Sequence, residues 1–265
     1  MKVFKVKGIK IFYDEKLDGG GTFFGQLYVP IVRKLVGKSK TCFEAFSGPA
    51  FIGFSLLANN LCEELVVADI NPEAINYIKL TVNENNLSRK VRYYIADVLE
   101  GIPESERFDL VVGNPPHFNE STIKEFCRIY GVECSNAIEM LKSYDPGWKL
   151  HKRFYDSIHK FLNKGANIIL VENSEGSSEK DFIEFIQKGG LKYVKTIHPT
   201  LDDIAEAYYI FIKGFDIKVG IPKVVKHLPI SVFRPLFLLG AKTYKPAKEL
   251  VSLYSKFYFI YSKYN

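Results

Sequence analysis

The sequence predicts an α/β fold built on a doubly wound, mostly parallel seven-stranded sheet. Short apolar runs alternate with helical patterns along most of the chain, which is typical of strands joined by crossover helices. The early runs end at a polar residue or a turn, as strands of a parallel sheet do at their carboxyl edge. The 265 residues, 47% hydrophobic and 25% charged, have ordinary globular composition and can bury a full core. We therefore expect one α/β domain with additions.

The first half of the chain contains the pattern of βαβ units. We expect strands at 41–47, 65–69, 91–96 and 109–113, and helices at 50–60 and 72–86. Each predicted strand is short and rich in Val, Ile, Leu and aromatic residues, as strands buried in a parallel sheet are. The order so far is β-α-β-α-β-β, which favours a doubly wound arrangement.

The second half continues the alternation and then changes at its end. We expect helices at 121–141, 148–162 and 179–188, and strands at 167–172, 193–197 and 207–212. Only the short segment from Pro199 to Asp203 separates the last two strands. This connection is too short for a crossover, so we expect a terminal antiparallel hairpin at the edge of the sheet.

Three parts of the chain differ in composition. Residues 1–40 precede the first predicted strand and include Gly19–Gly21, which reads either as a flexible loop or as a lid over a ligand. Residues 41–213 form the predicted α/β domain. Residues 214–265 are basic and aromatic with several prolines, and they are expected to form a C-terminal extension.

The C-terminal extension carries the positive charge of the protein. The formal net charge is +6, and residues 214–265 contain nine Lys or Arg against two acidic residues. An anionic partner is therefore expected, either nucleic acid or, less favoured because prolines interrupt residues 228–244, a membrane surface. In a purely structural interpretation the aromatic side chains cover a sheet edge or a dimer interface. The oligomeric state is not determined by the sequence.

Composition also bears on compartment and metal binding. The first ten residues alternate apolar with basic side chains, and no run of 18 uncharged apolar residues follows, so we expect a cytoplasmic protein. The four cysteines are scattered and have no metal-ligand spacing with the five histidines. We expect free buried thiols and no metal site. The cysteines are Cys42, Cys62, Cys127 and Cys134.

Polar residues follow four of the predicted strands. Glu44 precedes a small-residue turn at Gly48, and Asp69 and Asp97 follow the next two strands. After the fourth strand comes Asn114-Pro115-Pro116-His117, a rigid turn whose side-chain and backbone oxygens can accept hydrogen bonds from an –NH2 group. Strand ends of this kind bind ligands in open α/β sheets. However, Asn-Pro is also a common turn, and acidic residues at strand ends also cap helices.

The run from Glu44 to His117 resembles the cofactor half of class I S-adenosylmethionine-dependent methyltransferases. The resemblance rests on VVADINPEAINYIKLTVNENNL, VRYYIADVLEG and FDLVVGNPP in this order. It extends upstream to Phe12–Thr22 and downstream to about residue 213, and it is strongest with the small-domain branch that carries the Asn-Pro-Pro motif. That branch includes ribosomal RNA guanine-N2 methyltransferases and release-factor glutamine methyltransferases. The resemblance implies a Rossmann-like methyltransferase fold and S-adenosylmethionine as cofactor.

The resemblance also implies a role for each strand-end residue. Glu44 and the turn at Phe46 and Gly48 would hold the methionine part of the cofactor. Asp69 with Ile70 would bind the ribose hydroxyls, and Asp97 with Val98 the adenine. Asn114, with the Pro115 carbonyl, would bind the target nitrogen beside the cofactor methyl group.

Two positions depart from the pattern of that branch. Phe46 and Ala50 stand where glycines are commonest. His117, followed by Phe118, stands after Pro116 where an aromatic residue usually stacks on the target. We therefore expect Pro116, His117 and Phe118 to contact the substrate, with His117 among the catalytic residues. For Asp145, Trp148 and His151, helix capping and core packing are sufficient explanations.

The sequence thus predicts an N-methyltransferase that acts on an exocyclic amino group of a base in ribosomal or transfer RNA. One alternative is methylation of a protein glutamine or amide, against which stands the short segment before the first strand. Another is methylation of a small-molecule amine, with residues 119–147 as a substrate lid. A cofactor-binding or RNA-binding module without catalysis is the alternative from a different class.

Overall fold

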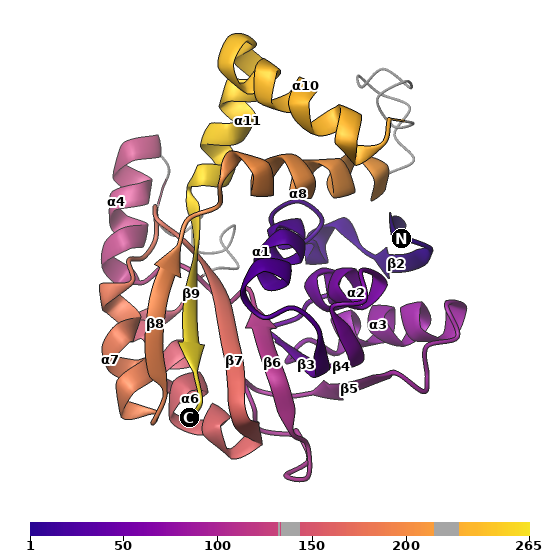
Figure 1. Ribbon diagram of the computed structural model, residues 1–265. Coiled ribbons are helices and arrows are strands. Elements are labelled where there is room, and N and C mark those ends of the chain that lie inside the picture. Colours follow the sequence, from indigo (N-terminus) through magenta and orange to yellow (C-terminus); the bar gives the residue numbers. More distant parts are fainter. Residues whose placement is uncertain (132, 134–143, 215–227) are drawn as a thin grey trace.

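The computed structural model describes residues 1–131, 133, 144–214 and 228–265, and its centre is a seven-stranded sheet (Figure 1). The strand order is β5-β4-β3-β6-β7-β9-β8, in which only β9 is antiparallel to its neighbours. The order reverses between β3 and β6, so the predicted fold class is confirmed. The strands are β3 (Ser39–Ala45), β4 (Cys62–Asp69), β5 (Val91–Ile95), β6 (Phe108–Gly113), β7 (Leu162–Asn173), β8 (Lys192–Ile197) and β9 (Phe257–Lys263).

Helices cover both faces of the sheet, because alternate strand residues are apolar on both faces. Leu110 and Val112 of β6 belong to one buried core, whereas Val111 belongs to the other. The first core packs under α1 (Tyr28–Leu35), α2 (Phe51–Ala58), α3 (Pro72–Glu84) and α8 (Leu201–Gly214). The second packs under α6 (Lys149–Ser157), η4 (Ile158–Phe161) and α7 (Lys180–Lys188).

The predicted strand at 207–212 is wrong, because these residues lie within helix α8. Their aromatic and β-branched side chains favour a strand locally. In the fold, Ile204, Ala207 and Ile212 are buried at helical spacing against the first core. Asp203 accepts a hydrogen bond from the backbone N–H of Thr200 at the start of the helix. Tertiary packing therefore overrides the local preference.

The antiparallel pair at the edge of the sheet is formed instead by β8 and β9. β9 lies between β7 and β8 and pairs with β7 along its whole length and with β8 from Phe259 to Lys263 (Figure 1). Its aromatic side chains alternate between the two cores, with Phe259 in the first and Tyr258 in the second. The predicted boundary at residue 214 therefore cuts through the sheet, since the C-terminal extension supplies the strand next to the edge strand β8.

The rest of the described extension forms two helices above α8 in Figure 1. These are α10 (Ile230–Thr243) and α11 (Lys245–Ser255). Phe233 and Phe237 of α10 pack on Tyr208 of α8. Of the basic residues expected to meet an anionic partner, Lys218, Lys223 and Lys226 lie outside the described residues.

The N-terminal segment is more ordered than a flexible loop. β1 (Lys2–Val6) and β2 (Ile9–Tyr13) form an antiparallel hairpin, and β2 is hydrogen-bonded to α3 through Phe12 N–H and Thr81 Oγ1 at 3.0 Å. Two short turns, η1 (Glu15–Leu17) and η2 (Phe24–Leu27), lead to α1. Gly20 and Gly21 are packed closely, since a Cβ on Gly20 would lie 2.7 Å from the Phe24 ring and one on Gly21 2.6 Å from the Phe51 ring, whereas Gly19 has open space around it.

The remaining predictions concern the segment between β6 and α6, the cysteines and membrane spans. α4 (Glu120–Tyr130) occupies part of the predicted 121–141 helix and of the 119–147 lid, whereas residues 134–143 lie outside the described residues. η3 (Pro146–Trp148) precedes α6. Cys42 and Cys62 are free and buried as predicted, Cys127 is buried, and Cys134 is not described. No helix in the described ranges combines the length and the apolar character needed to cross a bilayer.

Candidate active site

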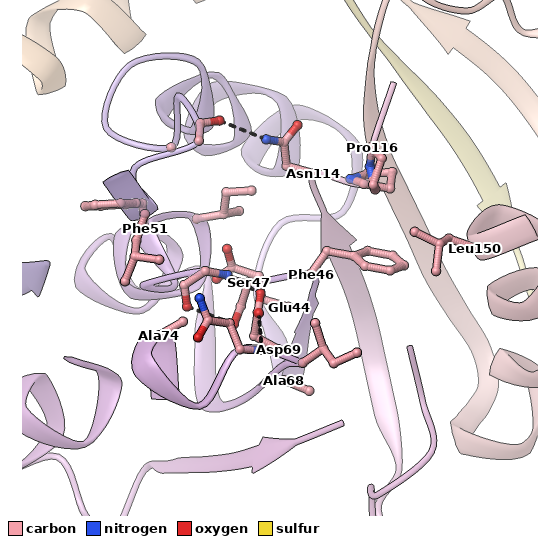
Figure 2. A pocket seen from close by; sticks show the side chains of 18 of the residues that line it. Glu44, Phe46, Ser47, Phe51, Ala68, Asp69, Ala74, Asn114, Pro116 and Leu150 are labelled. Atoms are coloured by element: carbon pink, nitrogen blue, oxygen red, sulfur yellow. Dashed lines mark hydrogen bonds between the residues drawn. The ribbon is translucent and has the colours of Figure 1, made fainter. Parts of the chain in front are cut away.

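A cavity of 510 Å³ lies at the carboxyl ends of β3, β4, β5 and β6, where the strand order reverses (Figure 2). It brings together ten of the predicted site residues, which are Glu44, Phe46, Gly48, Asp69, Ile70, Asp97, Val98, Asn114, Pro115 and Pro116. The N-terminal segment closes one side through Leu17, Asp18 and Gly19. Tyr144 and Leu150 border it from the other half of the chain. The size is ordinary for a small-molecule site.

The turn after β3 adopts left-handed backbone conformations at three alternate positions. The φ angles are 54° at Phe46, 49° at Gly48 and 64° at Ala50. Glycine adopts such angles freely, whereas a residue with a Cβ is strained by about 1–2 kcal/mol. The turn therefore keeps the backbone shape of a glycine-rich loop although two of its residues are not glycine. Strain of this kind is commonly found at functional sites.

Glu44 lies under this turn at the end of β3. Its side chain is buried, and its Oε2 accepts a hydrogen bond from Gly53 N–H at 2.6 Å. Burial raises the pKa of Glu44 to about 8, although the backbone amides of Gly53 and Ile52 act in the opposite direction. A Cβ on Gly53 would lie 2.7 Å from Oε2, so the close approach requires glycine. The carboxyl is therefore poised to ionise when a cation comes near.

Asp69 stands at the end of β4 with both carboxylate oxygens held by backbone amides. Oδ2 accepts from Gly48 N–H at 2.7 Å, and Oδ1 accepts from Asn71 N–H at 2.9 Å. The N-cap of α3 is Asn71, whose side chain accepts from Glu73 N–H. Asp69 is therefore not the helix cap that the alternative interpretation required. Its remaining lone pairs are available to a ligand in the cavity.

Asp97 follows β5, and its side chain is hydrogen-bonded to an arginine in the second half of the chain. Its Oδ1 accepts from Arg153 Nη1 of α6 at 3.0 Å. A backbone bridge joins Asp97 to Glu100, and Val98 has a φ of 60°. The chain then leads to β6, so the capping alternative does not apply to Asp97 either. Arg153 carries no sequence signal that connects it with Asp97.

The Asn-Pro-Pro turn lies on the opposite side of the cavity from Glu44 and Asp69 (Figure 2). Asn114 Nδ2 donates to the carbonyl of Gly19 at 3.2 Å, which fixes the orientation of the amide. No described residue donates to Asn114 Oδ1, so this oxygen is left as an acceptor. Just before it, the hydroxyl of buried Tyr28 lies 2.5 Å from the Gly113 carbonyl and 3.0 Å from that of Ile169. The turn is thus held by α1 and by the N-terminal segment.

His117 and Phe118 do not lie where stacking on a substrate would require. Neither is among the described residues that line the cavity, and both are buried. His117 Nδ1 lies 3.2 Å from Glu172 Oε2, and Phe118 packs against Ile123 and Cys127. The structure therefore gives no support to these two residues as substrate contacts, and His117 is instead part of a buried polar network.

Several lining residues were not identified from the sequence. Leu17 and Asp18 lie in the segment Phe12–Thr22, which resembles methyltransferases only as a whole. No local sequence feature identifies these two residues as lining the cavity. Tyr144 and Leu150 flank Asp145–Trp148, but their approach to the cavity depends on tertiary structure. Tyr28 could not be found either, because its partners lie far along the chain.

Comparison with known proteins finds similarity to methyltransferases. Residues 6–131 match the family described as "Methyltransferase small domain". The release factor glutamine methyltransferase of Clostridium acetobutylicum is 29% identical over 141 residues, which are 53% of this chain and 48% of that protein. The ribosomal protein uL3 glutamine methyltransferase of Francisella tularensis is 26% identical over 49% of this chain and 40% of that protein. The chain therefore spans about half the length, or less, of these two relatives.

A solved structure extends the likeness of the fold to most of the chain. An S-adenosylmethionine-dependent methyltransferase from Clostridium acetobutylicum aligns with a TM-score of 0.51 at 10% identity. The alignment covers 91% of this chain and 92% of that chain. At this identity the likeness concerns the fold alone.

Proposed function

We propose that this chain, whose residues 6–131 match the methyltransferase small domain family, transfers a methyl group from S-adenosylmethionine to the side-chain amide nitrogen of a protein glutamine. The observation that carries the proposal is the fixed amide of Asn114 at the cavity. Its Nδ2 is committed to Gly19, which leaves Oδ1 to accept from a planar –NH2 group. Asn114 and the Pro115 carbonyl are the proposed catalytic groups.

The chemistry of the cavity fits S-adenosylmethionine. The cofactor carries an ammonium group, a ribose diol and an adenine amino group, and the cavity offers one carboxyl for each. Glu44 would hold the ammonium beside the Phe46–Gly48 turn, Asp69 the diol and Asp97 the amino group. Ile70 and Val98 border the same positions and supply apolar contact. Three carboxyls at three neighbouring strand ends thus match three donor groups.

The cofactor supplies an activated methyl group on a sulfonium centre, so the protein has little acid or base chemistry to perform. Its task is to hold the acceptor nitrogen in line with that methyl group, about 3 Å away. Hydrogen bonds from the –NH2 to Asn114 Oδ1 and to the Pro115 carbonyl would aim the nitrogen lone pair. The same two dipoles would stabilise positive charge that develops on nitrogen.

One observation favours a glutamine amide over a nucleobase. The relatives that share half of this chain are named as glutamine methyltransferases. Recognition of the polypeptide around the glutamine would then depend on parts of the chain outside the shared half.

An exocyclic amino group of an RNA base is the second candidate acceptor. It presents the same planar –NH2 group to Asn114. The observation in its favour is the basic C-terminal extension, in which Lys242 and Lys248 are exposed and have no ion-pair partner within the described ranges. Lysines placed in this way neutralise phosphates and make affinity depend on salt.

Transfer of radiolabelled methyl groups into extract of a strain that lacks the gene would test the proposal. We expect label that resists nuclease, is released by protease and maps by mass spectrometry to a methylated glutamine. Label that is released only by nuclease would replace glutamine with the RNA candidate. Absence of label from extract, in a protein shown by calorimetry to bind the cofactor, would contradict both.

Charge reversal at Lys242, Lys245 and Lys248 separates the two candidates further. If RNA is the acceptor, the triple variant should bind RNA more weakly and with a flatter dependence on salt. If glutamine is the acceptor, cofactor affinity and methyl transfer should change less than about threefold. Charge reversal at Lys79, Lys124 and Lys152, exposed elsewhere on the surface, is the matched control.

A further inference from the structure

Four buried ionisable side chains form a network directly behind the Asn-Pro-Pro turn. His117, Asp145, His151 and Glu172 are each at most 6% exposed. Glu172 lies at the centre, with Oε2 at 3.2 Å from His117 Nδ1 and Oε1 at 3.0 Å from His151 Nε2. The second ring nitrogen of His151 lies 2.7 Å from Asp145 Oδ2. We call these four residues the Glu172 network.

The geometry determines where the protons of the network reside. An ionised carboxylate only accepts, so each ring nitrogen that faces one must carry a hydrogen. Both nitrogens of His151 face carboxylates, which makes its ring an imidazolium. Burial by itself lowers the pKa of His151, but the charge of Glu172 and the hydrogen bond to Asp145 outweigh it and raise the pKa to about 9. The Nδ1 of His117 likewise carries its proton toward Glu172.

The network connects four elements at the acceptor side of the sheet. His117 follows β6, Glu172 is next to the last residue of β7, and Asp145 accepts from Leu150 and His151 N–H at the start of α6. The backbone of the turn after β7 also packs closely against the backbone of His117, since a Cβ on Gly176 would lie 2.3 Å from the His117 carbonyl oxygen. The position of His117 is thus fixed by both its ring and its backbone.

The remaining polar groups near Glu172 are hydroxyls. Ser177 Oγ is 3.5 Å from Glu172 Oε2 and 3.0 Å from the hydroxyl of Tyr258 in β9. The hydroxyl of Tyr155 is buried. Burial raises the pKa of Tyr155, and the negative charge of Glu172 raises it further. None of these residues is among the described ones that line the cavity.

A network of this kind is not needed for stability alone. Buried ion pairs bring a desolvation penalty, and apolar side chains of similar volume often serve stability equally well. What a shared carboxylate adds is direction, because two imidazoles must stand at defined angles to it. One of the two imidazoles belongs to His117, the residue that immediately follows Pro116, so the network orients the end of the turn.

We propose that the Glu172 network positions the Asn114–Pro116 turn for methyl transfer, with Glu172 and His117 as positioning residues. The proposal rests on the proposed function, in which Asn114 orients the acceptor nitrogen. His117 thereby acts through the turn and not by contact with substrate. An aromatic residue at this position would face the acceptor, whereas His117 is drawn inward by Glu172.

The test compares Glu172→Gln with Ser177→Ala. Glutamine keeps the shape of glutamate but places an –NH2 against one of the two ring N–H groups. We expect kcat to fall about 10- to 100-fold in Glu172→Gln with cofactor affinity unchanged, because a displacement of about 1 Å at the reacting centre has effects of that size. Ser177→Ala, which removes a hydroxyl only 3.5 Å from Oε2 of the same carboxylate, should keep kcat within about threefold. Equal kcat in both variants would overturn the proposal.

A second pair of variants serves if Glu172→Gln does not fold. His117→Asn retains a side-chain N–H near the position of Nδ1, whereas His117→Leu removes it. We expect His117→Asn to keep at least about tenfold more activity than His117→Leu at similar melting temperatures. Equal activity of the two would show that the hydrogen bond to Glu172 has no positioning role.

A spectroscopic measurement separates this proposal from the proposed function. The side-chain amide resonance of Asn114 in ¹⁵N-labelled protein reports the turn without any acceptor. A shift of this resonance in Glu172→Gln but not in Ser177→Ala would support positioning even if the wild type methylated nothing. An unshifted resonance in Glu172→Gln, together with a wild type that transfers methyl groups, would overturn positioning and leave the proposed function intact.

Discussion

The two sides of the cavity are held in different ways. On the cofactor side, Glu44 and Asp69 are fixed by backbone amides of the two neighbouring turns, which lie between Gly48 and Asn71. On the acceptor side, Asn114 is fixed by Gly19 and by the Glu172 network. The positions of Glu44 and Asp69 are therefore encoded within one βαβ unit, whereas Asp97, held by Arg153, and the acceptor turn depend on elements far away along the chain.

Local and remote hydrogen bonds differ in how readily distant relatives can share them. A local motif is inherited as a unit, because its hydrogen bonds are made by its own backbone. A turn held by remote side chains changes whenever those remote parts change. The similarity to the release factor enzyme accordingly covers about half of each chain, and the acceptor class is where relatives can diverge.

The largest effect should come from Asn114→Ala, which removes the acceptor side alone. We expect methyl transfer to fall about 100- to 1000-fold, as for loss of a donor or acceptor that stabilises developing charge. Cofactor affinity measured by calorimetry should change less than about threefold. Asn83→Ala, at an exposed position on α3, is the control. An equal loss of cofactor affinity in Asn114→Ala would show that the two sides are not separable.

Asp69→Ala should produce the converse result. Loss of hydrogen bonds to a carboxylate costs about 1.5–3 kcal/mol, so we expect cofactor affinity to fall about 10- to 100-fold. At saturating cofactor, kcat should remain within a few-fold of the wild type. Asp156→Ala, an exposed aspartate on α6, should change neither quantity. A fall in kcat at saturation would contradict the division of the cavity.

The raised pKa of Glu44 predicts that the protein releases a proton when the cofactor binds. A pKa of about 8 means that the carboxyl is mostly protonated at pH 7. Approach of the ammonium group of the cofactor should lower that pKa, so close to one proton should be released on binding at pH 7 and almost none above pH 9.5. Calorimetry in two buffers with different ionisation enthalpies measures this number. Glu44→Gln should bind more weakly and release no proton; release that persists in that variant would assign the proton elsewhere.

The same carboxyl affects the stability of the cofactor-free protein. Its folded pKa of about 8 lies above the unfolded value of about 4.3, so the folded state holds the extra proton between these values. Its contribution to the free energy of unfolding should therefore decline as pH rises from about 4.5 to 8 and level off above. Glu44→Gln should flatten this part of the profile, as measured by urea unfolding.

The smallest effect should come from Gly48→Ala. The φ of 49° strains any residue with a Cβ, and that Cβ would lie 3.3 Å from the Leu17 carbonyl. We expect the free energy of unfolding to fall by about 1–2 kcal/mol. Gly165→Ala, with a φ of 82° and open space around it, should lose a similar amount, and only Gly48→Ala should also weaken cofactor binding. Equal cofactor affinity in both variants would show that the turn does not approach the ligand.

The sequence predicted well which strand-end residues meet at the cavity, because the signals for strand ends are local. Strands buried on both faces appear as short apolar runs, and the residue after each run is placed at the edge where ligands bind. Glu44, Asp69, Asp97 and Asn114 therefore line one cavity as expected.

Prediction from the sequence failed where the structure of a segment depends on residues that are distant along the chain. Residues 207–212 have strand-forming side chains, and only packing against the first core makes them helical. β9 has no local feature that distinguishes a central strand from an aromatic extension, since β7 and β8 are remote in sequence. His117 was expected at the cavity because of its neighbours in the chain, but Glu172 holds it in the interior.

The position of β9 also constrains how the protein is assembled during synthesis. β7 and β8 are synthesised well before β9, the strand that lies between them in the sheet. Until β9 is synthesised, each of the two strands has an unpaired edge. Exposed strand edges in a nascent chain favour association with other chains. Translation that stops after α11 would therefore release a polypeptide with a nearly complete cofactor half and an open sheet, which chaperones or proteases must remove before it aggregates.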